Sequence, residues 1–230
     1  MVNTRTSKGD DSPSGGARRT QAERRRATRQ ALLEAALLRM ESGESFDSLS
    51  LRSLARAAGV VPTAFYRHFA SMDELGLALV DESFRTLRAM LRQAREGGAP
   101  PEQVIEASVS TLTGYVRDHR EHFAFLARAR STGNTLLRHA IRAEIRLLTS
   151  ELATDLTRFP ILAEWSTEDL QMVAGLLVNS MISTVEAILD TPADDAEAQG
   201  EIAAVAEKQL RLIVLGIPGW RSGRRGRRRT

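Results

Sequence analysis

The chain contains no cysteine and no long uninterrupted apolar run, and each absence excludes a class of protein. Among its 230 residues there is no Cys, which excludes disulfides, thiolate zinc sites and a cysteine nucleophile, and fits a reducing cytoplasm. No apolar run approaches the roughly 20 residues that cross a bilayer. The Arg-rich N-terminus is not followed by the apolar segment of a signal peptide. We therefore expect a soluble cytoplasmic protein that neither spans a membrane nor is exported.

Sequence motifs that carry catalysis are also missing. The chain has no phosphate-cradling glycine loop, no nucleophile elbow and no zinc-protease motif. His119 and His122 lie three residues apart, next to Asp118 and Glu121, which is the one local spacing that resembles a metal site. A solvated polar surface explains this pair, because no more distant ligand is evident. We therefore expect no metal, no cofactor and no enzymatic activity.

Charge of opposite sign is segregated along the chain, although the formal net charge is only +3. Residues 1–70 hold 12 Lys and Arg against 7 Asp and Glu, residues 71–220 hold 14 against 22, and residues 221–230 add six Arg without an acid. Such asymmetry predicts that the N-terminal region meets a polyanion. Nucleic acid is the simplest polyanion, and a membrane surface is the alternative at this point.

Apolar residues recur at helical spacing from one end of the chain to the other, which predicts an all-α protein of about nine helices. Residues 1–17 and 221–230 bury too little apolar surface to fold and are expected to be a disordered arm and a disordered basic tail. Residues 18–70 should form a DNA-binding domain of three helices, and residues 71–220 a helical regulatory and dimerisation domain. The predicted helices are 18–40, 51–58, 62–69, 71–95, 102–118, 120–130, 134–157, 167–189 and 197–215.

Residues 51–69 have the pattern of a helix, a sharp turn and a second helix. Ser50 can cap the first helix. Gly59 permits the turn, and Pro62 suits the first turn of the following helix, where its missing N–H is not needed. Ser166 should likewise cap the helix that begins near residue 167.

The second of these helices has two different faces. At about 100° per residue, Phe65 and Phe69 project to one side, whereas Thr63, Tyr66 and Arg67 project to the other. A helix-turn-helix inserts its second helix into the DNA major groove, so this helix needs an apolar inner face and a polar outer face. The pattern therefore predicts a DNA-reading helix whose two Phe are structural.

The residue patterns around this motif resemble those of the TetR family of bacterial repressors. AAGV at 57–60, TAFYRHF at 63–69 and DEL at 73–75 carry the resemblance. A narrower similarity, to the branch that represses unsaturated fatty-acid synthesis and acyl desaturation, rests on SLSLR at 48–52, PTAFYRHF at 62–69, DELGL at 73–77 and VDES at 80–83. The family commonly has a lysine at the start of the fourth helix, where this chain has Met72 or Asp73, and the branch generally lacks that lysine too.

The resemblance implies a homodimer that binds a palindromic double-stranded DNA operator. Arg can take guanine O6 and N7 together, Thr and Ala methyls can meet a thymine methyl, and a Tyr hydroxyl typically holds a phosphate. Residues 18–26 should add unspecific phosphate attraction or a minor-groove contact. The candidate DNA-binding residues are Arg52, Thr63, Ala64, Tyr66, Arg67 and His68. Dimerisation is expected through the last two helices, with Leu176, Leu177, Met181, Ile182 and Leu210 as interface candidates.

The narrower similarity further implies a long-chain fatty acyl-CoA as effector, with its acyl chain in an apolar tunnel and its phosphates near basic residues. The candidate ligand-binding residues are Phe84, Leu87, Leu91, Val109, Leu112, Phe123, Leu126, Arg128, Arg130 and Arg138. Apolar residues at these positions would equally serve an ordinary helical core.

Two other functions fit the sequence. One is a TetR-type repressor of an efflux or catabolic operon that responds to another apolar small molecule. The other is an architectural protein whose Arg-rich tails supply most of the DNA affinity while the helical domain dimerises. The architectural protein differs from a repressor in that its sequence preference would not survive loss of the tails.

Overall fold

The computed structural model describes residues 20–96, 103–131 and 133–223. The predicted N-terminal arm, Arg18, Arg19 and most of the predicted basic tail lie outside these residues. Over the described ranges the chain folds into nine α-helices joined by turns and short 3₁₀ segments, with no β-strand. This confirms the predicted all-α class and the predicted number of helices.

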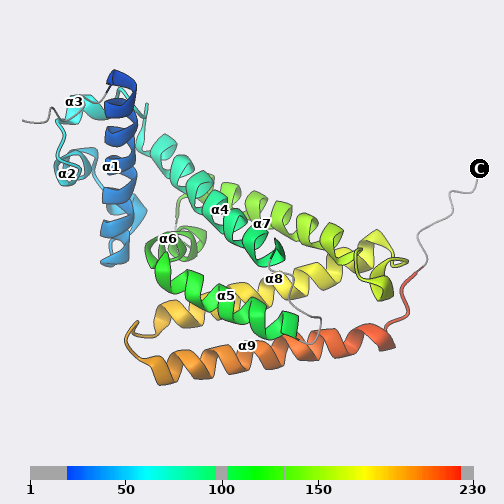
Figure 1. The fold of residues 1–230 in the computed structure, drawn as a ribbon. Coiled ribbons are helices and arrows are strands. Elements are labelled where there is room, and N and C mark those ends of the chain that lie inside the picture. The colour runs from blue at the N-terminus through cyan, green and yellow to red at the C-terminus, as the bar shows by residue number, and fades with distance from the viewer. Residues whose placement is uncertain (1–19, 97–102, 132, 224–230) are drawn as a thin grey trace, which may run out of the picture.

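The helices fall into a small head and a larger body (Figure 1). The head holds the first three helices, α4 leads from the head into the body, and α8 and α9 pack side by side along the body's lower edge. The bounds are α1 (Gln21–Glu41), α2 (Leu51–Ala57), α3 (Pro62–Phe65), α4 (Met72–Glu96), α5 (Val104–Asp118), α6 (Arg120–Ser131), α7 (Thr135–Leu156), α8 (Thr167–Asp190) and α9 (Ala196–Gly216).

Side-chain caps set where several helices begin. Ser50 accepts a hydrogen bond from the Ser53 N–H at 3.1 Å, and Ser166 accepts one from the Asp169 N–H at 3.1 Å, which confirms both predicted caps. Helix α1 begins later than predicted because Thr20 and Glu23 form a capping box there. The cap side chain satisfies backbone N–H groups that have no partner within the helix, so the chain enters the helix at that residue.

The predicted helix over residues 62–69 is shorter in the structure. Regular α-helix covers Pro62–Phe65, and tighter turns follow, in which the Arg67 N–H bonds to the Ala64 carbonyl at 3.1 Å and the His68 N–H to the Phe65 carbonyl at 2.8 Å. Bonds between residues three apart are typical of 3₁₀ geometry at a helix end. Gly59 has a φ of +69°, so the turn before this helix uses the left-handed conformation that favours glycine.

One apolar core joins the head to the body across the predicted domain boundary at residue 70. Phe65 and Phe69 are buried in it, as predicted. The same cluster includes residues of α1, α4, α6 and α7, among them Leu32, Leu33, Met40, Leu75, Leu79, Phe125, Ala129, Leu137 and Ile141. A displacement of α6 or α7 therefore acts directly on the packing of the head.

Gly76 allows the closest approach within this core. A Cβ at this position would lie 2.7 Å from Cζ of Phe46 and 2.9 Å from Cδ2 of Leu137, and both side chains are buried. These distances are shorter than van der Waals contact, so glycine is what lets the start of α4 lie between the head and α7.

Helix α8 is more apolar than the sequence analysis anticipated. It is long and apolar enough to cross a membrane by length and composition, with a mean hydropathy of 1.7 over 18 residues. Core helices of globular proteins meet the same criterion, and α8 buries Leu170, Val173, Ala174, Val178 and Ile188 inside the protein.

We predict that Gly76→Ala destabilises the fold whereas Gly200→Ala does not. Overpacking typically costs about 1–3 kcal/mol, which exceeds the helix-propensity gain of up to about 1 kcal/mol from replacing glycine by alanine. A Cβ at Gly200, in α9, meets nothing within 4 Å, so that variant should gain stability. Urea unfolding of both variants measures the difference, and equal stabilities would contradict the role given to Gly76.

Candidate DNA-reading face and ligand cavity

The predicted DNA-reading residues lie on one accessible face of the head. Arg52, Thr63, Tyr66 and Arg67 are exposed, and Ala64 and His68 are partly buried. Tyr66 has 64% of its surface exposed, and Val61 beside it is equally open. The predicted division between buried Phe and outward polar residues is therefore confirmed, while contact with DNA remains a prediction for each residue.

Basic side chains of α1 lie next to this face. The sequence analysis expected of residues 18–26 only an unspecific attraction to phosphates or a minor-groove contact. The Arg25 guanidinium donates to the Arg67 carbonyl at 3.3 Å, and the Arg29 guanidinium lies 4.9 Å from the centre of the Phe69 ring. Burial, followed by the positive charges of Arg25, Arg29 and Arg67, lowers the pKa of His68. The neutral form of the His68 ring is therefore favoured over the charged form.

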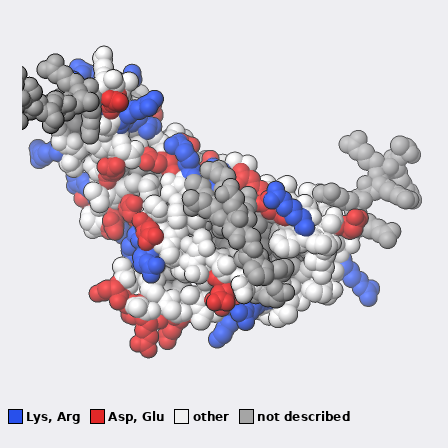
Figure 2. Space-filling view, in the orientation of Figure 1, with Lys and Arg blue, Asp and Glu red and all other residues white. Residues whose placement is uncertain are grey.

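Figure 2 shows Lys and Arg gathered at the end of the molecule that carries α1 and α3. Asp and Glu gather around the turn between α8 and α9, where Asp190, Asp194, Asp195, Glu197 and Glu201 are exposed. The basic side chains of this end and the acidic side chains of the α8–α9 turn are therefore separated in space.

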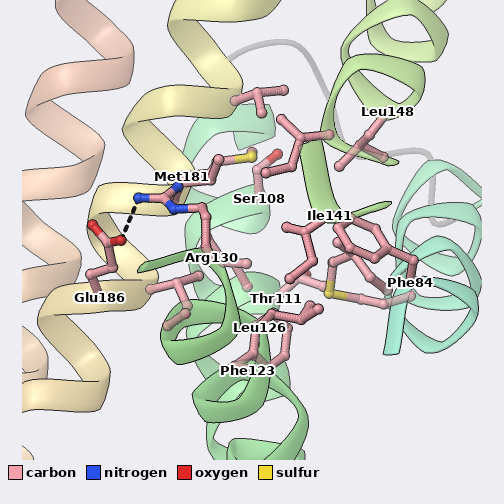
Figure 3. A pocket seen from close by; sticks show the side chains of 18 residues that line it. Phe84, Ser108, Thr111, Phe123, Leu126, Arg130, Ile141, Leu148, Met181 and Glu186 are labelled. Atoms are coloured by element: carbon pink, nitrogen blue, oxygen red, sulfur yellow. Dashed lines mark hydrogen bonds and ion pairs between the residues drawn. The ribbon is translucent and has the colours of Figure 1, made fainter. Parts of the chain in front are cut away.

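A cavity of about 160 Å³ lies in the body between α4, α5, α6, α7 and α8 (Figure 3). Its wall is apolar apart from a few side chains. Six of the predicted ligand-binding residues line it, namely Phe84, Leu87, Leu112, Phe123, Leu126 and Arg130. The structure therefore gathers these residues around one space, and the binding of a ligand there remains a prediction.

Three other ligand candidates lie away from this cavity. Val109 is buried in a separate cluster with Ala206 and Leu210. The Arg128 guanidinium donates to the Met40 carbonyl at the end of α1, and the Arg138 guanidinium donates to the Thr135 hydroxyl at 3.3 Å. The fourth candidate, Leu91, has a side chain outside the described part of the structure.

The sequence analysis missed much of the cavity wall, in particular the part that α7 and α8 supply. The additional lining residues are Met90, Ser108, Thr111, Ala127, Ile141, Ile145, Leu148, Val178, Met181, Ile182, Val185 and Glu186. Met181 and Ile182 had been expected at the dimer interface. On α8, the lining positions 178, 181, 182 and 185 recur at helical spacing, which was the available signal for an inward face.

An ion pair interrupts the apolar wall. Arg130 of α6 donates to Glu186 of α8 at 2.6 Å, and their side chains are 33% and 42% exposed. Ser108 and Thr111 of α5 add two hydroxyl groups to the lining. Polar groups at a few points of an apolar wall are what orients a ligand in a small-molecule site.

Helix α6 lies between the cavity and the head. One face, with Phe123, Leu126 and Arg130, lines the cavity. Its other face, with Phe125 and Ala129, is buried in the core that contains α1. Helix α6 therefore contacts both the cavity and the core that contains α1.

Helices α8 and α9 leave a set of large apolar side chains exposed. These are Met172 and Leu176 on α8, with Val205, Leu212, Val214 and Leu215 on α9. Of the predicted interface residues, Leu176 belongs to this set, whereas Leu210 is buried within the protomer. Leu177 is partly buried against two core clusters of the same chain.

The histidine pair that resembled a metal site has protein partners instead. His122 Nδ1 lies 2.8 Å from the hydroxyl of the buried Ser83, and the His119 ring packs 4.3 Å from the ring of Tyr115. Among the described residues, no group of three or more His, Cys, Asp or Glu is arranged to hold a metal ion. Burial, partly opposed by the charges of Glu121 and Glu82, lowers the pKa of His122.

Two family comparisons together span both parts of the chain. Residues 32–79 match the family described as bacterial regulatory proteins of the tetR family, and residues 101–216 match the tetracyclin repressor-like C-terminal domain. The chain belongs to the TetR family. Regulators of this family bind DNA operators as dimers, respond to small-molecule effectors and are not enzymes.

Solved structures of several other proteins share the fold of the chain. The fatty acid degradation regulator FadR from Bacillus halodurans has 14% sequence identity and a TM-score of 0.63, and the match covers 85% of this chain and 97% of that one. A regulator from Rhodococcus sp. has 20% identity and a TM-score of 0.60 over 80% and 99% of the two chains. GusR from Salmonella enterica has 18% identity and a TM-score of 0.59 over 80% and 95%. At these identities the likeness concerns the fold.

We predict that His122 makes the stability of this TetR regulator fall in mild acid. The folded state holds the pKa of His122 below its ordinary value of 6.5. The unfolded chain therefore takes up a proton that the folded chain resists, and stability is lost as the pH falls below about 6.5. His122→Asn retains an acceptor for Ser83 and should weaken this pH dependence. Melting temperatures at pH 7.5 and 5.5 measure it, with the exposed His139→Asn as control, and an unchanged dependence in His122→Asn would contradict it.

Proposed function

We propose that this TetR regulator represses genes of fatty-acid desaturation or lipid metabolism by binding a palindromic operator as a homodimer, and that a long-chain acyl-CoA changes its DNA affinity. We expect it in the cytoplasm, on the nucleoid when bound. The observation that carries the proposal is the position of α6, which has one face on an apolar cavity and the other on α1 of the head.

The apolar character of the cavity supports an effector with a hydrocarbon body. Aromatic, Leu, Ile, Val and Met side chains of five helices surround it. A lipid function is also named for one structure of similar fold, the fatty acid degradation regulator from Bacillus halodurans. That likeness is one of fold, so the motif similarity at residues 48–83 remains the specific argument for lipid genes.

The shared core provides a physical route from ligand to DNA. A ligand shifts an equilibrium between two arrangements only by binding one of them more tightly. An occupied cavity changes the positions that α6 can adopt, and α6 bears on α1 through Phe125, Ala129 and the Arg128 bond to Met40. The two heads of a dimer read half-sites about 34–36 Å or a multiple apart, so a change in their separation alters operator affinity.

We propose that the exposed apolar set on α8 and α9 forms the dimer interface. Val205, Leu212 and Leu215 are spaced seven and three residues apart, which places them on one side of α9. Met172 and Leu176, four apart, do the same on α8. A two-fold interface uses the same patch on both subunits, and an apolar patch of this kind suits it.

One observation favours the second candidate, a repressor that responds to another apolar molecule. Coenzyme A carries several phosphate charges, whereas Arg130 is the one basic side chain in the described cavity wall and is paired with Glu186. Arg128 and Arg138, the other proposed phosphate partners, bond elsewhere. A ligand with little charge therefore also fits the described wall.

We predict that Arg52→Ala and Tyr66→Phe weaken operator binding while the fold and the dimer persist. Loss of an Arg contact with a base or phosphate typically costs about 1–3 kcal/mol, or roughly tenfold in affinity. Loss of the Tyr hydroxyl should have a smaller effect. Gel-shift affinities measure both, with Arg158→Ala, beyond the end of α7 and far from the head, as control. Unchanged affinity in both variants would refute this reading face.

We predict that long-chain acyl-CoA alters the amount of operator complex. Saturated and unsaturated acyl-CoA of equal length are titrated into a preformed complex, with free coenzyme A as control, and DNA release is followed by fluorescence anisotropy. Because the ligand must distinguish two arrangements of the heads, at least one acyl-CoA should change the affinity. No change with either would remove acyl-CoA as the effector, and a response to coenzyme A alone would exclude a role for the acyl chain.

A further inference from the structure

We infer that the cavity takes an amphiphile with a single carboxylate, whose oxygens replace Glu186 at the Arg130 guanidinium. This inference rests on the second candidate function above, a TetR repressor that responds to another apolar molecule, because it takes the cavity to be the effector site of a ligand that is not an acyl-CoA. To that function it adds the charge of the ligand's polar end and the side of the cavity at which this end lies. The family match specifies neither.

The charged pair of the cavity wall lies at one side of the cavity. In Figure 3 the Arg130–Glu186 pair lies at one side of the cavity, and Phe84, Ile141 and Leu148 lie at the other. A ligand that satisfies both sides must be polar at one end and apolar over the rest, because burying an unpaired polar group in the apolar part is unfavourable.

Arg130 has hydrogen-bonding capacity to spare. A guanidinium carries five N–H donors in a fork that matches a carboxylate. Within the described residues, Glu186 is the acceptor that Arg130 has, at 2.6 Å from one terminal nitrogen. The Ser108 and Thr111 hydroxyls, also in the wall, have no side-chain hydrogen bond to a described residue. A second carboxylate at this position therefore finds unused donors.

The Arg130–Glu186 pair favours an anionic ligand over a cationic one. Glu186 is the more exposed of the two side chains, so it can turn into water at little cost when another carboxylate takes its place, since exposed ion pairs contribute little. A cation at Glu186 would instead leave the less exposed Arg130, which cannot lose its proton, beside a second positive charge.

Replacement of Glu186 by a ligand carboxylate at Arg130 would also change the contact between α6 and α8. The Arg130–Glu186 bond connects the last turn of α6 to α8. A ligand carboxylate that takes over Arg130 holds α6 through the ligand instead of through α8. Headgroup binding and the position of α6 are then coupled at the same side chain.

The experiment compares four probes that share a 14-carbon chain and differ in headgroup. Tetradecanoate, tetradecanol, tetradecyltrimethylammonium and tetradecanoyl-CoA compete with Nile red for the purified full-length protein, below their micelle concentrations. A charge-assisted hydrogen bond contributes enough for about a tenfold difference. Tetradecanoate should therefore displace the dye at roughly tenfold lower concentration than tetradecanol, and the cation should be weakest.

Two variants test whether the preference for tetradecanoate depends on the Arg130–Glu186 ion pair. Arg130→Met keeps the length of the side chain and should reduce tetradecanoate to the affinity of tetradecanol. Glu186→Gln removes the competing carboxylate and should strengthen tetradecanoate alone, which is a gain that a misfolded protein cannot show. Arg158→Met is the matched control, because the exposed Arg158 also pairs with an acid, the partly buried Asp155, and lies away from the cavity wall; it should behave as wild type.

The inference is overturned if the protein binds tetradecanol or the cation as tightly as tetradecanoate, if the acid's advantage survives Arg130→Met, or if no probe displaces the dye. It is also overturned if tetradecanoyl-CoA binds far more tightly than the free acid, because the site would then bind the several phosphate charges of coenzyme A and not a single carboxylate. Operator affinity, measured with the same probes, is a separate readout. Arg130-dependent tetradecanoate binding without any change in DNA affinity supports the inference while refuting the effector role.

Discussion

The burial of α6 between the head and the cavity is the constraint on which the rest of this structure depends. Phe125 and Ala129 fill space beside α1, and Phe123 and Leu126 fill space beside the cavity, so a single helix belongs to both environments. Packed interiors tolerate little volume change. A helix held on two sides is therefore expected to transmit a displacement instead of absorbing it, and this is the physical basis of the proposed coupling between a ligand in the cavity and the head.

Charge has a different role in the head and at the cavity. In the head, burial and then the positive charges of Arg25, Arg29 and Arg67 lower the pKa of His68, so several like charges lie close together there. Near the cavity a single Arg is matched by a single Glu. Long-range attraction needs several like charges, whereas orientation of one small ligand needs a few placed polar groups.

Local patterns were sufficient for the helices and for the division of residues 63–69 into a buried and an exposed side. The positions of Phe65 and Phe69 opposite Thr63, Tyr66 and Arg67 follow from helical periodicity, and caps at Ser50 and Ser166 follow from side chains that bond to backbone two or three residues on. The shortening of α3 was not foreseen, because the choice between α and 3₁₀ bonding at a helix end rests on small energy differences.

The sequence by itself determined the all-α class, the helix-turn-helix and the family, because each depends on patterns of residues that lie close together in the chain. The tertiary structure alone decided which apolar residues line a cavity and which fill a core. Val109 and Leu112 are three apart on one helix, yet the first is buried against α9 and the second borders the cavity. Arg130 and Glu186 are 56 residues apart, and helix packing, which no local pattern records, brings them together.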